Sequence, residues 1–366
     1  MRWNPGSVKH RSPVVIRLPP TASLDRIPGI DVPLSLEPME AESVSGLPEG
    51  SRWQYEPKWD GFRCVTFKDG DRVELQSRNQ KPLGRYFPEL VEALVDLPLD
   101  RFVFDGEILA FIEGEPTFEV LQLRLHPAAS RVAKLAEQQP ATFMAFDLLA
   151  GEDGKSVISR TLRERRALLE SMFEGIDPDL ARVMLSPATT DRDLALRWLR
   201  EIGHGLDGIV AKRLDLPYQP GDRAMRKYKL WTTVDCVIAG VYYKQPGQQL
   251  DSLLLGLYDR EGLLHYVGRV RVGKADPETE RRIRPLIGGR LAFSGRAPGG
   301  PSRWSGRERN PIPVKPKQVV EVSADHITDN HMRHGARLLR WRDDKPPKRC
   351  TMDQIAGGRS GAQEVS

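Results

Sequence analysis

The sequence predicts an α+β domain followed by an all-β domain, and two observations support this fold class. As far as about residue 229, segments with the helical period alternate with strand-like segments. From Val234 onward, short strand-like segments separated by turn-forming residues dominate, which is typical of a small barrel. A chain of 366 residues is long enough for about two domains, each with its own core.

The first domain is expected to open with a hairpin. Val65 and Phe67 precede the turn-forming residues 68–71, and Val73 and Leu75 follow them. Further strands are expected at 102–111, 141–148 and 208–212, and helices are expected to begin near Tyr86, Ser130 and Thr161 and to span 191–202. Ser130 and Thr161 are candidate helix N-caps, and Glu164 completes a capping box with Thr161.

The second domain is predicted to consist mainly of strands. Strands are expected at 234–243, 252–258, 263–272 and 318–324, with one helix at 277–287. Gly and Pro in the intervening segments favour turns. These residues by themselves indicate an all-β domain without specifying the type of barrel.

The two ends of the chain lack the period of a helix or a strand. Residues 1–35 are rich in Pro and Arg and are expected to form a disordered arm, and residues 353–366 a disordered tail. The longest apolar run near the start is Val14-Val15-Ile16, which is too short for a signal peptide. Since no apolar run has the length of a membrane span, we expect a cytoplasmic protein without a membrane partner.

Cysteine content and charge narrow the function classes. Only three cysteines occur, with no Cys-x-x-Cys pair, so neither a structural zinc site nor a disulfide framework is expected. The net charge is +5. Residues 281–309 carry eight arginines against one acid, and residues 333–349 carry seven Lys or Arg against two acids. A solvated charged face explains one such run, but two runs in the same third of the chain favour contact with nucleic acid.

The segment Tyr55–Arg63 carries the clearest chemical pattern. Lys58 lies three residues before Gly61, with Asp60 between them and Arg63 beyond. A lysine amine becomes a nucleophile when cationic or apolar neighbours lower its pKa, and an arginine can hold phosphate or ribose oxygens. A surface lysine before a turn is the alternative interpretation of this segment taken alone.

Other segments repeat a known order of motifs. They are Ser77-Arg78-Asn79, Phe104–Glu107, Phe143–Leu149, Leu206–Lys212, Lys227-Tyr228-Lys229 and Arg342–Lys345. With Lys58 they resemble the covalent nucleotidyltransferases, the superfamily of ATP-dependent DNA ligases, RNA ligases and mRNA capping enzymes. The chain most resembles the small bacterial ATP-dependent DNA ligases of the ligase C type, in Tyr55–Arg63, 85–90 and 253–258, and the resemblance runs from about residue 36 to about residue 350.

This resemblance implies a nucleotidyltransferase (adenylation) domain with antiparallel sheets at 36–230 and an OB-fold domain at 231–352. It implies an ATP-dependent DNA ligase that seals 5′-phosphate/3′-hydroxyl nicks through a lysyl-AMP and a DNA-adenylate intermediate. Lys58 is the expected nucleophile, ATP the AMP donor and Mg²⁺ (or Mn²⁺) the metal. The expected partner is nicked double-stranded DNA, in DNA repair with unidentified repair proteins, and the expected state is a nucleoid-associated monomer.

Charged residues of the motifs are assigned to phosphate and metal. Lys212, Lys227 and Lys229 are expected to stabilise the negative charge that develops on phosphate oxygens. Glu107 and Asp207 are the acids assigned to ribose and metal, because Mg²⁺ takes one or two carboxylates together with phosphate oxygens. Asp207 departs from the superfamily pattern, which has glutamate at this place.

The remaining site residues are assigned to the base and to the nick. The resemblance implies that Phe146 stacks on adenine, with Val210 on the other face. Glu56 offers a carboxylate to the exocyclic amine of adenine, which favours ATP over GTP. Arg78 is expected to take the 5′-phosphate of the nick. Asp105 is assigned a structural role.

Arg342 and Lys345 form the last motif, which in relatives of this kind orients pyrophosphate in the first step. Two other functions remain open at this point. One is an RNA ligase or a capping-type nucleotidyltransferase, against which Glu56 and the expected OB-fold speak. The other is a non-catalytic nucleic-acid-binding module. Loss of Lys58 would indicate such a module, and the presence of Lys58 speaks against it.

Overall fold

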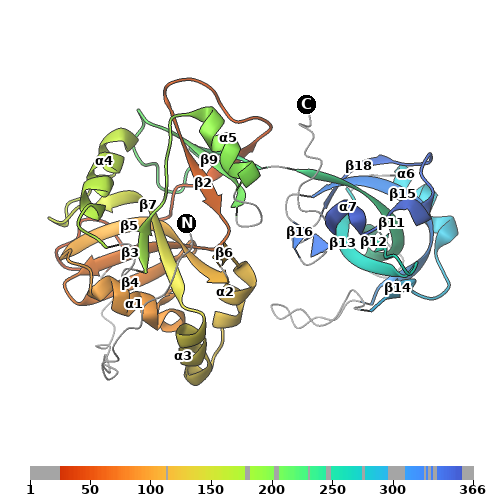
Figure 1. Ribbon diagram of the computed structural model, residues 1–366, viewed down its shortest axis with the longest axis horizontal. Coiled ribbons are helices and arrows are strands. Elements are labelled where there is room, and N and C mark those ends of the chain that lie inside the picture. The colour runs from red at the N-terminus through yellow and green to blue at the C-terminus, as the bar shows by residue number, and fades with distance from the viewer. Residues whose placement is uncertain are drawn as a thin grey trace. The chain divides into compact units, whose positions relative to one another are not determined.

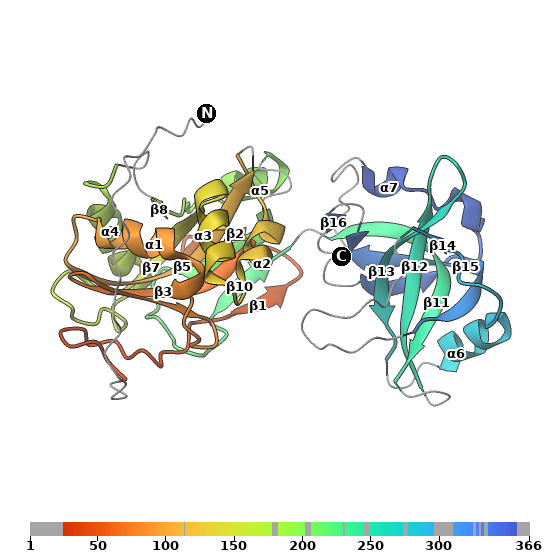
Figure 2. The same cartoon turned by 90° about the horizontal axis from the view of Figure 1, so that it is seen from below.

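The computed structural model describes residues 25–356, with gaps at 113, 178–181, 202–205, 230, 245–248, 274–276, 296–309, 325–326, 329–330 and 333–335. The chain divides into two compact units, Met1–Lys229 and Leu230–Ser366, each described by itself below (Figures 1 and 2). Residues 1–24, most of the expected arm, lie outside the described residues, and so does the second half of the 281–309 basic run, residues 296–309.

A six-stranded sheet forms one layer of the first unit. Its order is β4-β3-β5-β7-β8, and β6 pairs with β5 beside this path. The strands are β3 (Phe62–Asp69), β4 (Arg72–Ser77), β5 (Arg101–Ile112), β6 (Glu115–Pro116), β7 (Ala141–Ala150) and β8 (Val183–Leu185). All pairings are antiparallel except β7–β8. The β3–β4 pair confirms the predicted hairpin.

Four helices of the first unit lie on the side of this sheet, and a fifth packs on the other sheet. The four are α1 (Pro88–Val95), α2 (Phe118–Arg124), α3 (Ala129–Gln138) and α4 (Leu162–Phe173), whereas α5 (Arg192–Glu201) contacts the four-stranded sheet described next. Leu90 and Leu94 of α1 are fully buried in one core with Phe102 and Phe143 of the sheet. Thr161 and Glu164 form the predicted capping box of α4. The prediction for Ser130 is wrong: α3 begins one residue earlier, and its N-cap is Ala128 without a side-chain hydrogen bond.

A four-stranded sheet forms the second layer, in the order β1-β10-β9-β2. The strands are β1 (Ala41–Val44), β2 (Trp53–Trp59), β9 (Leu206–Arg213) and β10 (Met225–Tyr228). β1 runs parallel to β10, and the other neighbours are antiparallel. Since side chains alternate along a strand, Gln54, Glu56 and Lys58 point to one face of β2.

A closed barrel forms the second unit. Its strands are β11 (Thr232–Tyr243), β12 (Leu250–Tyr258), β13 (Leu264–Arg271), β15 (Ile312–Ala324) and β18 (Ala336–Trp341), with the short β14 (Phe293–Ser294) beside β13. The order β12-β11-β15-β18-β13 closes through a further β12–β13 pairing. Five strands closed in this way confirm the expected OB-type barrel. The short pair β16 (Ile327–Thr328) and β17 (His331–Met332) and helix α6 (Pro277–Ile283) also belong to this unit.

Three predictions about the extent of ordered structure are wrong. The sequence placed the last strand at 318–324, but strand β18 follows it. Residues 25–35 are not a disordered arm: Ile27, Ile30 and Val32 are buried in one cluster with Phe67 of β3. The predicted tail begins too early, since residues 353–356 form helix α7 (Asp353–Ala356). No helix in the described part of the chain is long and apolar enough to cross a membrane.

Candidate active site

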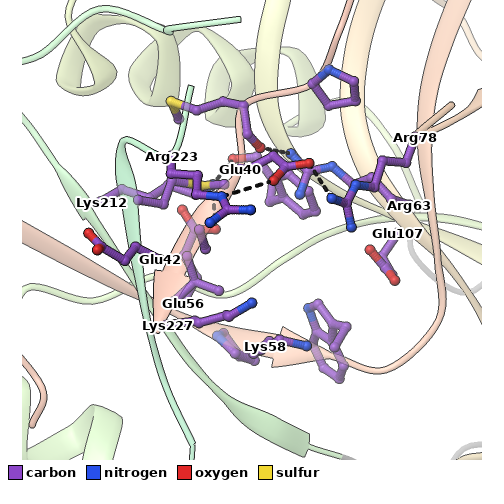
Figure 3. Close-up of a pocket in the computed structure, with 18 of the residues that line it drawn as sticks. Glu40, Glu42, Glu56, Lys58, Arg63, Arg78, Glu107, Lys212, Arg223 and Lys227 are labelled. Carbon is purple, nitrogen blue, oxygen red and sulfur yellow. Dashed lines mark hydrogen bonds and ion pairs between the residues drawn. The ribbon is translucent and has the colours of Figure 1, made fainter. Parts of the chain in front are cut away.

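A cavity of about 540 Å³ opens in the first unit (Figure 3). Residues 38–43 and strands β2, β9 and β10 supply one part of its lining, and β3, β5 and β7 supply the other. Among its lining residues are the following predicted ones: Glu56, Lys58, Arg63, Arg78, Glu107, Phe146, Val210, Lys212 and Lys227. Predicted site residues that are up to 171 positions apart in the sequence, Glu56 and Lys227, therefore line one cavity.

Lys58 ends in a group of ionic contacts around Asp207. The Asp207 carboxylate accepts hydrogen bonds from the ammonium groups of Lys58 and Lys229, the latter at 2.9 Å. Asp207 is only 4% exposed, and its second oxygen has no partner in the described part of the chain. Burial acts to raise the pKa of Asp207, but the two lysines outweigh burial and hold it below its usual range.

Lys227 adds a further cation to this group. Burial lowers its pKa, and the positive charges of Lys58 and Lys229 lower it further. β10 carries Lys227 and leads directly into Lys229, while Gly208 of β9 packs against the Tyr228 carbonyl between them. A Cβ at Gly208 would lie 2.3 Å from that carbonyl oxygen, and φ there is +148°. Glycine therefore lets the two strands approach closely enough to gather these lysines around Asp207.

Lys212 belongs to a second group, around Glu56. Its ammonium group lies 2.7 Å from Glu56 Oε2, and both side chains are 3% exposed. The other Glu56 oxygen accepts a 2.8 Å hydrogen bond from the buried Gln54 amide. Lys212 also lies 4.4 Å from the centroid of the Phe146 ring. The predicted phosphate lysines are thus divided, since Lys212 lies against the predicted base residues and Lys229 against Asp207.

Arg63 and Glu107 face the same cavity from the larger sheet. Both oxygens of the fully buried Asp105 accept hydrogen bonds from Arg63, each at 2.6 Å, and the guanidinium lies 4.4 Å from the Phe146 ring centroid. Glu107 accepts a hydrogen bond from the Gly61 N–H at 3.1 Å. Burial raises the pKa of Glu107 to about 7, although the charges of Arg63 and Lys58 act to lower it.

Arg78 lies at the rim of the cavity, one residue beyond β4. Its guanidinium pairs with Glu40, and Arg223 lies 3.6 Å from the other oxygen of the same carboxylate (Figure 3). Arg78 is 62% exposed, so it is accessible to an anion from solvent. Glu40 was not predicted from the sequence.

Arg342 and Lys345 belong to the second unit, where both contact Asp235 of β11. Arg342 donates to the two oxygens of Asp235 at 3.0 and 3.1 Å, and Lys345 donates to one of them at 2.7 Å. Arg342 also pairs with Asp344 at 2.8 Å. Glu321 lies 3.7 Å from Arg342 as well, so three carboxylates surround these two cations in this structure.

Several contributing residues were missed. Besides Glu40 they are Met39, Gln54, Tyr218 and Asp235, none of which belongs to a recognised motif. Gln54 could have been found, because it lies two residues before Glu56 on a strand and so shares its face. Met39 and Tyr218 could not, since nothing in the sequence joins positions that are 179 residues apart.

Comparison with known families decides the identity. The family model described as ATP dependent DNA ligase domain matches residues 38–229, which is more than half of the chain. The model described as ATP dependent DNA ligase C terminal region matches residues 246–345. The chain belongs to the ATP-dependent DNA ligases.

Individual relatives agree with the predicted ligase C type. The ligase is 45% identical over 363 residues to DNA ligase C2 of Mycolicibacterium smegmatis, covering 89% of this chain and 96% of that protein. It is 43% identical over 347 residues to DNA ligase C of Mycobacterium tuberculosis, covering 87% and 93%. A solved structure from work on DNA binding by Lig E DNA ligases, described as a minimal scaffold, shares the fold. Its TM-score is 0.51 at 17% identity, covering 84% of this chain and 100% of that one.

Proposed function

We propose that this ligase seals 5′-phosphate/3′-hydroxyl nicks in duplex DNA and that Lys58 carries the AMP. The Lys58 amine displaces pyrophosphate from the α-phosphorus of ATP and forms a phosphoramidate bond to AMP. The 5′-phosphate of the nick then takes AMP from Lys58. Finally the 3′-hydroxyl attacks the adenylated 5′-phosphate, forms the phosphodiester and releases AMP. One observation carries this proposal: Lys58 lies in a cavity among Asp207, Lys227 and Lys229.

The lysines suit the charge that develops on phosphorus. Each displacement places negative charge on phosphate oxygens, and preorganised cations stabilise it in a site that excludes water. Lys227 and Lys229 lie beside the nucleophile and are proposed for this role. Lys212 is also proposed to contact the nucleotide, from the side of Phe146 and Glu56 that we assign to the base.

Other lining residues are proposed to position the nucleotide. Phe146 and Val210 would hold the adenine ring between them, and Glu56 would accept from its exocyclic amine with the lone pairs left by Gln54 and Lys212. Arg63 is proposed for ribose or phosphate oxygens. Arg78 at the exposed rim is proposed for the 5′-phosphate of the nick.

A divalent metal fits the residues present. The described residues contain no cluster of three or more His, Cys, Asp or Glu side chains. Mg²⁺ nevertheless needs only one or two carboxylates when phosphate oxygens supply other ligands. Asp207 has a buried oxygen without a protein partner, and Glu107 lines the cavity, so we propose these two as ligands for Mg²⁺ or Mn²⁺. When bound, the metal would neutralise charge on the phosphate oxygens.

The proposed setting is DNA repair, as expected for a ligase of this type. In this role the protein would act as a monomer on nicked DNA in the nucleoid. In the second unit, Arg342 and Lys345 are proposed to leave Asp235 and stabilise the departing pyrophosphate. An RNA ligase or capping enzyme is disfavoured by the family match. Sealing of nicked DNA should exceed sealing of the same nick in duplex RNA, and the reverse result would change the substrate class.

The adenylation proposal is tested with ATP labelled at the α-phosphate. Incubation with Mg²⁺ should label the wild-type protein but neither Lys58→Ala nor Lys58→Arg, since a guanidinium cannot act as the nucleophile at neutral pH. Lys81→Ala is the control. Lys81 is exposed and follows the β3–β4 hairpin of the same unit, so this variant should be labelled normally. Label on Lys58→Arg, or none on the wild type, would refute the mechanism.

A further inference from the structure

A closed ring of hydrogen bonds lies behind the cavity. The Tyr218 hydroxyl donates to Asp105 Oδ2 at 2.7 Å and accepts from the Met39 N–H at 2.8 Å. Arg63 donates to both Asp105 oxygens and, at 3.3 Å, to the Met39 carbonyl. Both backbone groups of Met39 are therefore held, one by Tyr218 and one by Arg63.

Only two members of this ring touch the cavity. Met39 and Arg63 line it, whereas Tyr218 and Asp105 are 3% and 0% exposed and are absent from its lining. The two hydrogen bonds of the Tyr218 hydroxyl are buried, which makes them costly to lose, whereas those of Arg63 are only partly buried. The ring thus connects two buried groups to two groups that a nucleotide would meet.

The connection between β9 and β10 holds the cavity wall at further points. Gly221 N–H donates to the Glu37 carbonyl at 3.0 Å, and Glu40 N–H donates to the Asp222 carbonyl at 2.8 Å. Tyr218 belongs to the same connection. Its hydroxyl donates to Asp105, which in turn accepts from Arg63, so Asp105 links this connection to Arg63. The hydroxyl thereby fixes the wall segment 38–43 and the Arg63 guanidinium relative to each other.

We propose that Tyr218 is a positioning residue for ATP: its hydroxyl sets the places of Arg63 and the 38–43 wall, and through them the affinity for the nucleotide. This proposal rests on the proposed function, in which this cavity holds ATP. Tyr218 touches no reacting atom, so its loss weakens binding and leaves the displacement at phosphorus nearly as fast. The structure offers a matched control in Tyr55, which is 1% exposed and donates its hydroxyl to the Pro48 carbonyl at 2.8 Å.

The test compares Tyr218→Phe with Tyr55→Phe, since each loses one buried hydroxyl. Self-adenylation is measured over a range of ATP concentrations without DNA, and thermal unfolding is measured in parallel. Tyr218→Phe should raise the ATP concentration for half-maximal rate about tenfold, with a maximal rate within about threefold of wild type. Tyr55→Phe should lower the unfolding temperature similarly and leave the half-saturating concentration unchanged.

A second variant tests whether the ring acts as a unit. Asp105→Asn removes the charge that holds Arg63, so adding Tyr218→Phe to it should change ATP half-saturation little further. Additive effects, or an unchanged half-saturation in Tyr218→Phe, would overturn the proposal and leave the hydroxyl a purely structural group. If no protein becomes labelled, the affinities of Tyr218→Phe and Tyr55→Phe for ATP are compared instead by calorimetry in EDTA. This measurement needs no lysyl-AMP, so it distinguishes failure of the lysyl-AMP mechanism from failure of the proposed role of Tyr218.

Discussion

Glu107 makes the stability of the folded protein depend on pH. Its carboxyl lines the cavity and accepts from the Gly61 N–H, yet burial raises its pKa to about 7. In the unfolded chain an ordinary glutamate ionises near pH 4.3. The folded protein therefore binds this proton more tightly than the unfolded chain, and the resulting stabilisation is present at low pH and is lost as the pH rises to about 7.

We predict that Glu107→Gln flattens this pH dependence. The free energy of unfolding of the wild type should fall relative to that of the variant between pH 5 and pH 8, because only the wild type must then bury a charge. Urea denaturation of both proteins at several pH values measures the difference. Parallel curves would show that Glu107 is ionised in the folded protein throughout this range.

A second residue to test is Asp207, whose buried carboxylate contacts two lysines. Asp207→Ala should slow self-adenylation on the order of 10–100-fold at every Mg²⁺ concentration, as loss of a group that orients a site often does. Asp207→Glu should retain most of the activity if a longer carboxylate can serve, as the superfamily pattern suggests. Equal rates for Asp207→Ala and the wild type would reduce Asp207 to a structural residue.

At the scale of elements, the approach of β2–β3 to β5 depends on Gly61. A Cβ there would lie 2.1 Å from the Ile108 carbonyl oxygen and 2.9 Å from the Glu107 side chain. Backbone would have to move, and the Gly61 N–H would move away from Glu107. The turn after Lys58 is thus constrained by packing as well as by its chemistry.

Gly61→Ala should therefore lower the free energy of unfolding by about 2 kcal/mol, as overpacking of a close contact does. It should also reduce self-adenylation, because Glu107 and Lys58 flank the displaced turn. Gly46→Ala provides the control, since a Cβ at Gly46 meets nothing within 4 Å. Chemical denaturation and the labelling assay are run on both, and a Gly61→Ala protein as stable as Gly46→Ala would contradict this account.

The elements also show how far sequence reasoning could reach. Thr161 and the hairpin were predictable because their determinants lie within a few residues of each other. β18 was missed because Arg337 and Arg340 made its segment part of a basic run that was assigned to nucleic-acid contact, whereas barrel closure against β15 and β13 gives it partners. The site motifs were recognisable one by one, but the separation of Lys212 from Lys229 follows only from the register of three strands.

At the scale of the whole molecule, the second unit is expected to assist the first unit in one step, self-adenylation. In the described part of the chain, the ion pair of Lys345 is with Asp235, which belongs to the same barrel unit. Lys345→Ala should slow self-adenylation in the absence of DNA, because the departing pyrophosphate loses a cation. It should still seal a nick supplied already adenylated, since that step releases AMP.

Lys348→Ala is the matched control for this variant. Lys348 lies three residues away and donates to the Gly262 carbonyl at 3.1 Å instead of contacting Asp235. Rates of both steps, measured for both variants, separate the two possible roles of this basic segment. Normal DNA-free adenylation with weaker, salt-dependent nick binding in Lys345→Ala would make the segment a DNA clamp.

The parallel pairing of β1 with β10 has a consequence for synthesis of the protein on the ribosome. Ala41 pairs with Met225, so the cavity wall cannot be completed until 184 further residues (225 − 41) have been made. At about 5–20 residues per second this takes roughly 10–40 s. A nascent chain is thus expected to be unable to take up ATP during most of its translation. Ribosome-bound chains stalled before residue 225 should not become labelled, whereas chains stalled well beyond residue 229 should. Labelling of the shorter chains would contradict this order.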